Sequence, residues 1–430
     1  MRLLLAGILL CSSPSFALQP LEAFVSSALQ RNPDALEAKA NLDQQRAQSD
    51  LALGRVLPGI SARASYTRNQ YASVVTLTAT DSAGKPQTQT FTIVPIEQWD
   101  GSATLTVPLI DVAGWSRARA ASTGANAANE QLVSTRLFVE SQVVQDYYQL
   151  VANLALVAAS KQALDVSREN LRLAQTRYEA GVGQALDVDR AKAEVELQTQ
   201  QVAVAELQVS LGAQALESAS DVKPEVSETV KLGDDLRAEP PLPSFESDLE
   251  KLPAVSAAIE TTRAADQQAS AQRFTLLPTI AGTFTARGTN APGFGRQYTW
   301  QAVIAATWAL DFTTRANIEL QDSLLDAARA RELRARLAAR DAIHRQWETV
   351  SANIARSRSA RAGQTAAAHA VQQAHDRYQA GTITQLDLLQ AQRDAFTADV
   401  SRIQADADLV NARAQLRIAA GQSLVKEGMQ

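Results

Sequence analysis

Few side chains in this sequence could carry out chemistry, and their spacing argues against an enzyme. The histidines are His344, His369 and His375, and the last two lie six residues apart, which does not give the i, i+4 spacing of a metal-binding pair on one helix face. Cys11 is the only cysteine. The sequence has neither a glycine-rich phosphate loop nor a Gly-x-Ser-x-Gly motif. We therefore predict no catalytic residue, no metal site and no cofactor.

Two carboxylates, in contrast, recur at equivalent places. Asp187 and Asp387 each follow a glycine, four spacer residues and a leucine, in blocks that lie 200 residues apart. An acidic side chain is favoured at the positive end of a helix, and Thr384 with Asp387 resembles a capping box. We predict that Asp387 begins a helix. The shared positions of the two blocks are Arg177, Tyr178, Gly181 and Leu186, and then Arg377, Tyr378, Gly381 and Leu386.

The blocks lie between segments with helical periodicity. Residues 112–180 contain no proline, and at ~1.5 Å per residue they predict a helix of about 100 Å. A second such helix is expected over 313–380. Helices of about half that length follow, over 185–216 and 385–420. Gly181 and Gly381 are expected in a turn conformation that other residues resist. The low aromatic content of 5% also favours extended helices.

Two other segments alternate between apolar and polar residues, which predicts strands. They are expected to form β-hairpins over 57–110 and 277–311. Tyr298, Trp300 and Trp308 share the apolar face of the last strand, and the two tryptophans lie about 26 Å apart at ~3.3 Å per residue. This matches the ~25 Å apolar band between the aromatic girdles of outer-membrane barrels, although a soluble sheet covered by helices is the alternative.

The N-terminus has the pattern of an export signal. Arg2, an apolar run and Ser15-Phe16-Ala17 predict a signal peptide over residues 1–17, which contains Cys11. Leu10 is a poor residue to precede a lipidated cysteine, so a lipoprotein is disfavoured. No later apolar run reaches 18 residues. If the protein crosses a membrane, we expect it to do so with strands.

The sequence divides into two repeats. We predict a first repeat over 18–218, a linker over 219–250, a second repeat over 251–420 and a C-terminal tail over 421–430. Each repeat is expected to contain a helix, a β-hairpin, a long helix and a half-length helix. Leu57-Pro58 matches Leu277-Pro278 at an offset of 220, whereas the later blocks match at 200. The first hairpin is therefore expected to be about 20 residues longer.

Four strands per chain are too few to close a membrane barrel, because single-chain barrels need about eight. An open sheet edge in lipid would also leave backbone groups unpaired. Several chains are therefore expected to contribute strands to an oligomeric pore. The net charge of −5 comes without a basic face, which argues against nucleic acid as a partner.

These motifs resemble the TolC-like outer membrane factor family, the outer membrane efflux proteins. The resemblance rests on the two Arg-Tyr-x-x-Gly…Leu-Asp blocks, Asn32-Pro33, the two Leu-Pro strand starts and Pro108-Leu109-Ile110-Asp111. It implies an α+β membrane protein, in which a long helical coiled-coil barrel continues into a transmembrane antiparallel β-barrel. It also implies a homotrimer in the outer membrane of a Gram-negative bacterium, with 12 strands in lipid and 12 helices in the periplasm.

The resemblance further implies partners and sites. A periplasmic adaptor and an inner-membrane pump, of the RND or ABC type, would join the duct at its tip, where both turn blocks lie. Asp387 matches an acidic position that narrows the pore in this family. Gln390 stands where some members have a second acidic residue, so the resemblance implies one ring of carboxylates around the pore here instead of two, and gating by charge would depend on that single ring. The alternatives are a type I protein secretion outlet and a soluble periplasmic coiled-coil adaptor or scaffold.

Overall fold

A computed structural model describes residues 18–80, 84–225, 233–308 and 311–424. The predicted signal peptide and most of the predicted C-terminal tail lie outside these residues. The chain forms two compact units. Unit 1 comprises the described parts of Met1–Ala40, Glu130–Ser256 and Arg334–Gln430, and unit 2 comprises those of Asn41–Asn129 and Ala257–Leu333. Each unit draws on both halves of the sequence, so the units do not coincide with the sequence repeats.

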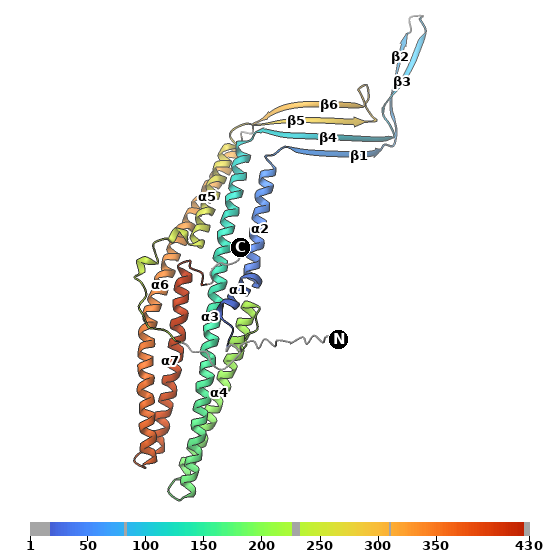
Figure 1. The fold of residues 1–430 in the computed structure, drawn as a ribbon. Coiled ribbons are helices and arrows are strands. Elements are labelled where there is room, and N and C mark those ends of the chain that lie inside the picture. Colours follow the sequence, from blue (N-terminus) through green and yellow to red (C-terminus); the bar gives the residue numbers. More distant parts are fainter. Residues whose placement is uncertain (1–17, 81–83, 226–232, 309–310, 425–430) are drawn as a thin grey trace, which may run out of the picture. The chain divides into compact units, whose positions relative to one another are not determined.

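Most of the described chain is helical (Figure 1). The long helices α3 and α6 have 68 residues each, and each precedes a turn and a helix of about half its length. Two short 3-10 helices, η1 (Leu242–Ser244) and η2 (Leu249–Lys251), lie in the linker. The helices are α1 (Leu21–Arg31), α2 (Pro33–Gly54), α3 (Val112–Glu179), α4 (Ala185–Ser220), α5 (Pro253–Phe274), α6 (Phe312–Gln379) and α7 (Gln385–Ala419).

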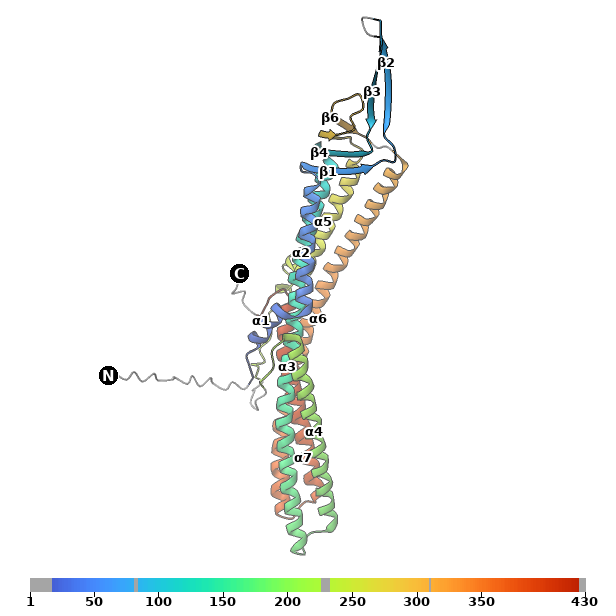
Figure 2. The same ribbon diagram turned by 90° about the vertical axis from the view of Figure 1, so that its right-hand side faces the viewer.

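Unit 1 contains two helical hairpins, α3 from Glu130 onwards with α4 and α6 from Arg334 onwards with α7, which Figures 1 and 2 show side by side. Its main apolar core joins α1, α3 and α4 with the end of α7, through side chains that include Phe24, Leu150 and Leu216. Phe24 packs against Tyr147 at a ring separation of 5.9 Å. This packing stabilises α1, because an isolated helix of 11 residues is only marginally stable in water.

The linker of unit 1 is fastened to α6 and α7 by a second core and by charge. Leu236 and Phe245 pack on a cluster that contains Ile343 and Leu416. Arg413 on α7 donates to Asp234 Oδ1 over 3.0 Å and to the carboxylate of Glu239. These three side chains are only 11–13% exposed. We call Arg413, Asp234 and Glu239 the linker clamp.

Unit 2 contains a four-stranded antiparallel sheet in the order β1-β4-β5-β6. The expected single hairpin over 57–110 is wrong in its middle part. β1 pairs with β4, but β2 and β3 form a separate two-stranded sheet, so the described chain has six strands rather than four. The strands are β1 (Gly59–Arg68), β2 (Ser73–Thr80), β3 (Pro86–Val94), β4 (Glu97–Ile110), β5 (Thr279–Thr289) and β6 (Tyr298–Thr307).

The register of the four-stranded sheet separates its two faces. Ile60 pairs with Leu105, Leu105 with Phe284, and Phe284 with Ala302, so apolar residues from all four strands share one face. The opposite face carries mainly hydroxyl, amide and charged side chains, because strand residues alternate in direction. Those residues include Arg63, Ser102, Thr104, Thr283, Thr285, Arg287 and Gln301.

Candidate functional site: the two helical turns and the exposed sheet face

The turns after α3 and α6 have the same backbone geometry. Gly181 and Gly381 both have a φ of +73°, which L side chains rarely adopt. In each turn the glycine N–H donates to the tyrosine carbonyl over 3.0 Å, and the next N–H donates to the arginine carbonyl over 2.9–3.0 Å. This is the Schellman arrangement, which satisfies the last carbonyl groups of a helix. The repeated Arg-Tyr-x-x-Gly pattern therefore encodes a helix end.

A second glycine in the first turn is also required, and the sequence pattern does not reveal it. A Cβ on Gly183 would lie 2.8 Å from Tyr178 N and 3.0 Å from Arg177 C, both of which are backbone atoms. Ile383 occupies the equivalent position in the second turn. The difference between the repeats at this position is the signal that could have identified Gly183.

Replacement of Gly183 by alanine is expected to destabilise unit 1 by ~1–3 kcal/mol, since the backbone must shift to admit the methyl group. Gly363→Ala is the matched control, because a Cβ there meets nothing within 4 Å and alanine is the better helix former. The urea midpoint of each variant measures the effect. Equal midpoints for Gly183→Ala and the wild type would show that the turn tolerates the methyl group.

The two turns are joined to each other. The Arg177 guanidinium lies 5.0 Å from the centre of the Tyr378 ring, and Arg177 Nη1 donates to the Tyr378 carbonyl over 3.2 Å. Tyr378 is 6% exposed, whereas its repeat partner Tyr178 is 52% exposed. Burial raises the pKa of the Tyr378 hydroxyl. The tyrosines thus differ in role: Tyr378 joins the hairpins, and Tyr178 lies at the surface.

Asp387 forms the capping box that its sequence predicts. Thr384 N donates to Asp387 Oδ2 over 3.0 Å, and Asp387 N donates to Thr384 Oγ1 over 3.2 Å. A further bond from Thr384 Oγ1 to Asp387 Oδ2 is the main reason why the pKa of Asp387 is lowered. In the first turn Gln184 occupies the cap position and makes no side-chain cap bond, so Asp187 lacks this role.

The other predicted turn residues lie at the surface. Arg377 and Gln390 are exposed, and Gln390 Nε2 donates to Asp394 Oδ1 over 2.9 Å. Leu186 and Leu386 are each about half exposed, at equivalent positions one residue before the repeated aspartates. Both turns therefore present an apolar side chain beside polar groups.

The apolar sheet face is largely uncovered within the chain. Trp300 is 73% exposed and stacks on Phe284 at a ring separation of 6.0 Å. Trp308 follows the end of β6, where its Nε1 donates to the Leu276 carbonyl over 2.9 Å. Tyr298 begins β6 at the end that carries Trp300. The pairing of Tyr66 with Trp99 adds two aromatic side chains that the sequence prediction did not include.

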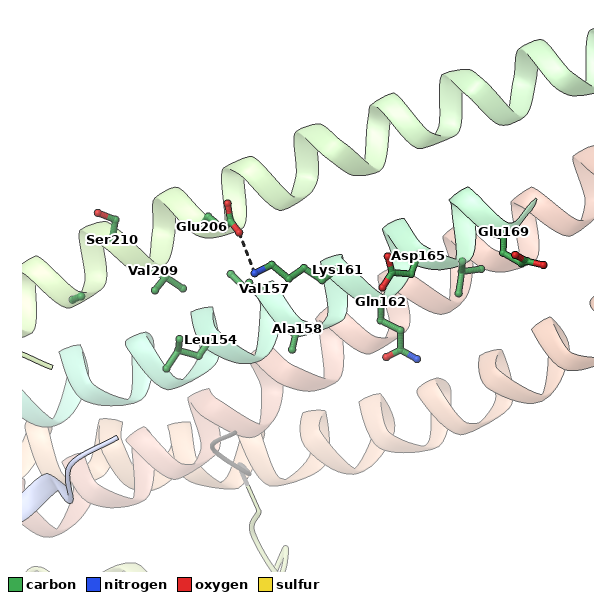
Figure 3. Close-up of a pocket in the computed structure, with 12 residues that line it drawn as sticks. Leu154, Val157, Ala158, Lys161, Gln162, Asp165, Glu169, Glu206, Val209 and Ser210 are labelled. Atoms are coloured by element: carbon green, nitrogen blue, oxygen red, sulfur yellow. Dashed lines mark ion pairs between the residues drawn. The ribbon is translucent and has the colours of Figure 1, made fainter. Parts of the chain in front are cut away.

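A groove of about 870 Å³ lies between α3 and α4 in unit 1 (Figure 3). Its walls include the apolar side chains of Leu154, Val157 and Val209, and Lys161 Nζ pairs with Glu206 Oε1 across it at 3.1 Å. In the described part of the chain, no cluster of histidine, cysteine and acidic residues could hold a metal ion. Nor, among those residues, is any helix both apolar and long enough to span a membrane.

The fold is that of solved outer membrane channels. The chain is similar to the CmeC outer membrane channel of Campylobacter jejuni, with a TM-score of 0.79 and 19% identity over 94% of this chain and 86% of that one. It is also similar to the open state of the MtrE outer membrane channel of Neisseria gonorrhoeae, with a TM-score of 0.76 and 19% identity over 96% and 92% of the two chains.

The sequence comparison agrees. The chain belongs to the outer membrane efflux protein family, whose model matches residues 24–220 and 246–422. It is 25% identical over 291 residues to the antibiotic efflux pump outer membrane protein ArpC of Pseudomonas putida, across 65% of this chain and 56% of that protein. The match thus spans just over half of the relative's length. The predicted resemblance to TolC-like outer membrane factors is confirmed.

Proposed function

We propose that this protein is an outer-membrane exit duct, which passes substrates from a periplasmic adaptor and an inner-membrane pump to the exterior. The uncovered apolar face of the sheet carries this proposal. Trp300, Ile304 and Ile60 are 73–80% exposed in the single chain. A soluble protein rarely leaves so continuous an apolar surface uncovered. Lipid would cover this face, and the family and the relatives named as efflux pump outer membrane proteins support that choice.

The same sheet supports a homotrimer. β1 and β6 are the edge strands, and each has one side without a partner in the described chain. Pairing β6 of one copy with β1 of the next would satisfy these edges, and three four-stranded sheets would make a twelve-stranded barrel. The polar face would then line a wet interior. Tyr298 and Trp300 at one end, and Trp308 at the other, would lie at the lipid–water interfaces.

The helical hairpins would form the periplasmic part of the duct. Their turns, with exposed Tyr178, Leu186 and Leu386, would dock the adaptor, and an RND or ABC pump would supply the energy. Relatives are named after antibiotic and toluene efflux pumps, which favours small molecules over proteins as the substrates.

Membrane fractionation tests this function. The full-length protein, expressed in a Gram-negative host, is expected in the outer-membrane fraction and to need detergent for extraction. It is expected to run as a trimer in detergent by size exclusion with light scattering. Recovery from the soluble periplasm without detergent would overturn the proposal and favour the soluble adaptor instead.

Asp387→Asn is expected to raise the single-channel conductance in planar bilayers, if three copies of this carboxylate narrow the pore. Asp187→Asn is the control, because this residue holds the equivalent position in the other repeat without the capping box. Equal conductance in both variants and the wild type would exclude a gate at Asp387.

Hydrogen bonds from Thr384 lower the pKa of Asp387 in the folded protein. The ionised carboxylate therefore stabilises the fold at pH values above its unfolded pKa, and this stabilisation is lost as the pH falls through the folded pKa.

A further inference from the structure

The polar face of the four-stranded sheet in unit 2 carries few charges. Arg63 on β1 and Arg287 on β5 both pair with Ser102 on β4, so these three residues form one row across the sheet. Asp100 lies two residues before Ser102 and therefore points to the same face. The other residues that the four described strands place on this face are uncharged.

The carboxylate of Asp100 is already engaged on the side of β5. Arg287 Nη2 donates to Asp100 Oδ1 over 2.8 Å, and Gln98 Nε2 donates to Asp100 Oδ2 over 2.7 Å. One carboxylate therefore compensates one of the two arginines. The polar face retains one positive charge per chain, at Arg63.

Arg63 has hydroxyl groups as neighbours but no counter-charge of its own. Its side chain is exposed and forms no ion pair or hydrogen bond with the described residues. Ser61 and Ser65 lie two residues away on β1, and Ser102 lies directly opposite on β4. Guanidinium and hydroxyl groups can both donate hydrogen bonds to an anion. The surroundings of Arg63 thus offer several donors to an anionic group.

A neighbouring copy of the chain would not neutralise this charge through the strand that it adds. In the proposed trimer β1 pairs with β6 of the next copy, and β6 contains no charged residue. No carboxylate of β6 can therefore meet Arg63, whatever register the two strands take. The described strands β2 and β3 contain no charged residue either. We therefore expect Arg63 to keep its positive charge uncompensated in the assembly.

We propose that Arg63 and Ser102 form an anion-binding site on the polar face, which three copies would repeat as a ring of positive charge inside the barrel. Its ligand would be the carboxylate, sulfate or phosphate group of a small anionic substrate. Rings of arginine or lysine favour anions in pores, because they attract anions and repel cations. The ring and its effect on transport rest on the proposed function, whereas the site itself lies within one chain.

Ser102→Cys tests the site by placing a reporter thiol between the two arginines. The predicted mature protein has no other cysteine, since Cys11 lies in the signal peptide. A sulfonate and an ammonium methanethiosulfonate, of opposite charge, attack the same thiolate, so the ratio of their rates reports the local potential. Adding Arg63→Gln is expected to lower the anionic-to-cationic ratio about fourfold at low ionic strength, the effect of one unit charge nearby in water.

Two further variants separate charge from structure in the Ser102→Cys background. Arg63→Lys keeps the charge and is expected to keep the ratio of rates. Arg68→Gln removes a charge from the same strand on the opposite face, and is also expected to leave the ratio unchanged. If Arg63→Gln and Arg68→Gln gave the same ratio, or if the thiol reacted with neither reagent, there would be no anion site here, whether or not the protein forms channels.

The reversal potential in a potassium chloride gradient across a planar bilayer tests the consequence for transport. The chloride-to-potassium permeability ratio is expected to fall about twofold or more in Arg63→Gln and to stay the same in Arg68→Gln. Carboxylates elsewhere along the pore, such as Asp387, are identical in these variants. An unchanged ratio in Arg63→Gln would exclude this residue from ion selectivity. A wild-type protein without conductance would count against the duct, while the thiol reaction rates would still decide the anion site.

Discussion

Ile304→Arg is expected to keep the protein out of the outer membrane. Ile304 is 76% exposed and lies at the middle of the apolar face, where it pairs with Gly282. A lipid-facing arginine near the bilayer midplane costs ~2–4 kcal/mol, and each copy in an oligomer would carry one. The amount of protein in the outer-membrane fraction, measured by immunoblot, is expected to fall at least several-fold.

Val303→Arg is the matched control for this experiment. Val303 is the neighbouring residue of β6 and pairs with Thr283 on the opposite face, which already contains Arg63 and Arg287. An arginine there would point into water if the polar face lines the pore, so this variant is expected to insert normally and to change only the conductance. If both variants insert equally well, or if only Val303→Arg fails, the assignment of the two faces is wrong.

The helices could be predicted from the sequence because their signals are local. Asn32 separates α1 from α2, and its Oδ1 accepts from Asp34 N over 2.9 Å, so this signal lies within two residues of the helix start. The turn glycines and the Thr384–Asp387 capping box likewise form their contacts with residues that are close to them in the sequence. Repetition at an offset of 200 residues strengthened each of these signals.

The middle of the first β-hairpin could not be predicted in the same way. Alternation continues through β2 and β3, so the pattern gives strands there but not their partners. The chain leaves the four-stranded sheet at Asn69, whose N–H donates to the Ile96 carbonyl over 2.7 Å and whose side chain donates to the Pro95 carbonyl over 2.9 Å. Pro95 was the available signal for a break, since proline cannot donate in a ladder.

Contacts between distant segments could not be predicted, because no local sequence pattern indicates them. Arg177 and Tyr378 are 201 residues apart, and each has an identical residue type in the other repeat that makes no such contact in the structure. The repeat therefore predicts symmetry where the fold is asymmetric. The linker clamp is likewise hidden, because Arg413 resembles the many other arginines of α6 and α7.

Replacement of Arg413 by methionine is expected to destabilise unit 1 by about 3 kcal/mol, because removing one partner leaves two buried carboxylates without compensation. Burial alone would lower the pKa of Arg413, but its hydrogen bonds to Asp234 and Glu239 outweigh that effect and raise it. Arg413 also donates to the Arg237 carbonyl over 2.6 Å, and Leu236 beside it has a φ of +54°. Loss of the cation is therefore expected to release a strained segment from α7 as well.

Arg237→Met provides the control, since Arg237 pairs with Asp235 at the surface, where both side chains are more than half exposed and such pairs contribute little. Urea unfolding followed by circular dichroism should show a lower midpoint for Arg413→Met alone. Adding Asp234→Asn and Glu239→Gln to Arg413→Met should recover most of the loss, because neutral amides need no cation. The amide oxygen introduced at position 234 can still accept from Leu236 N, as Asp234 Oδ1 does over 2.7 Å. Without that recovery, the lost stability would come from the packing of the arginine side chain, and the clamp would not be electrostatic.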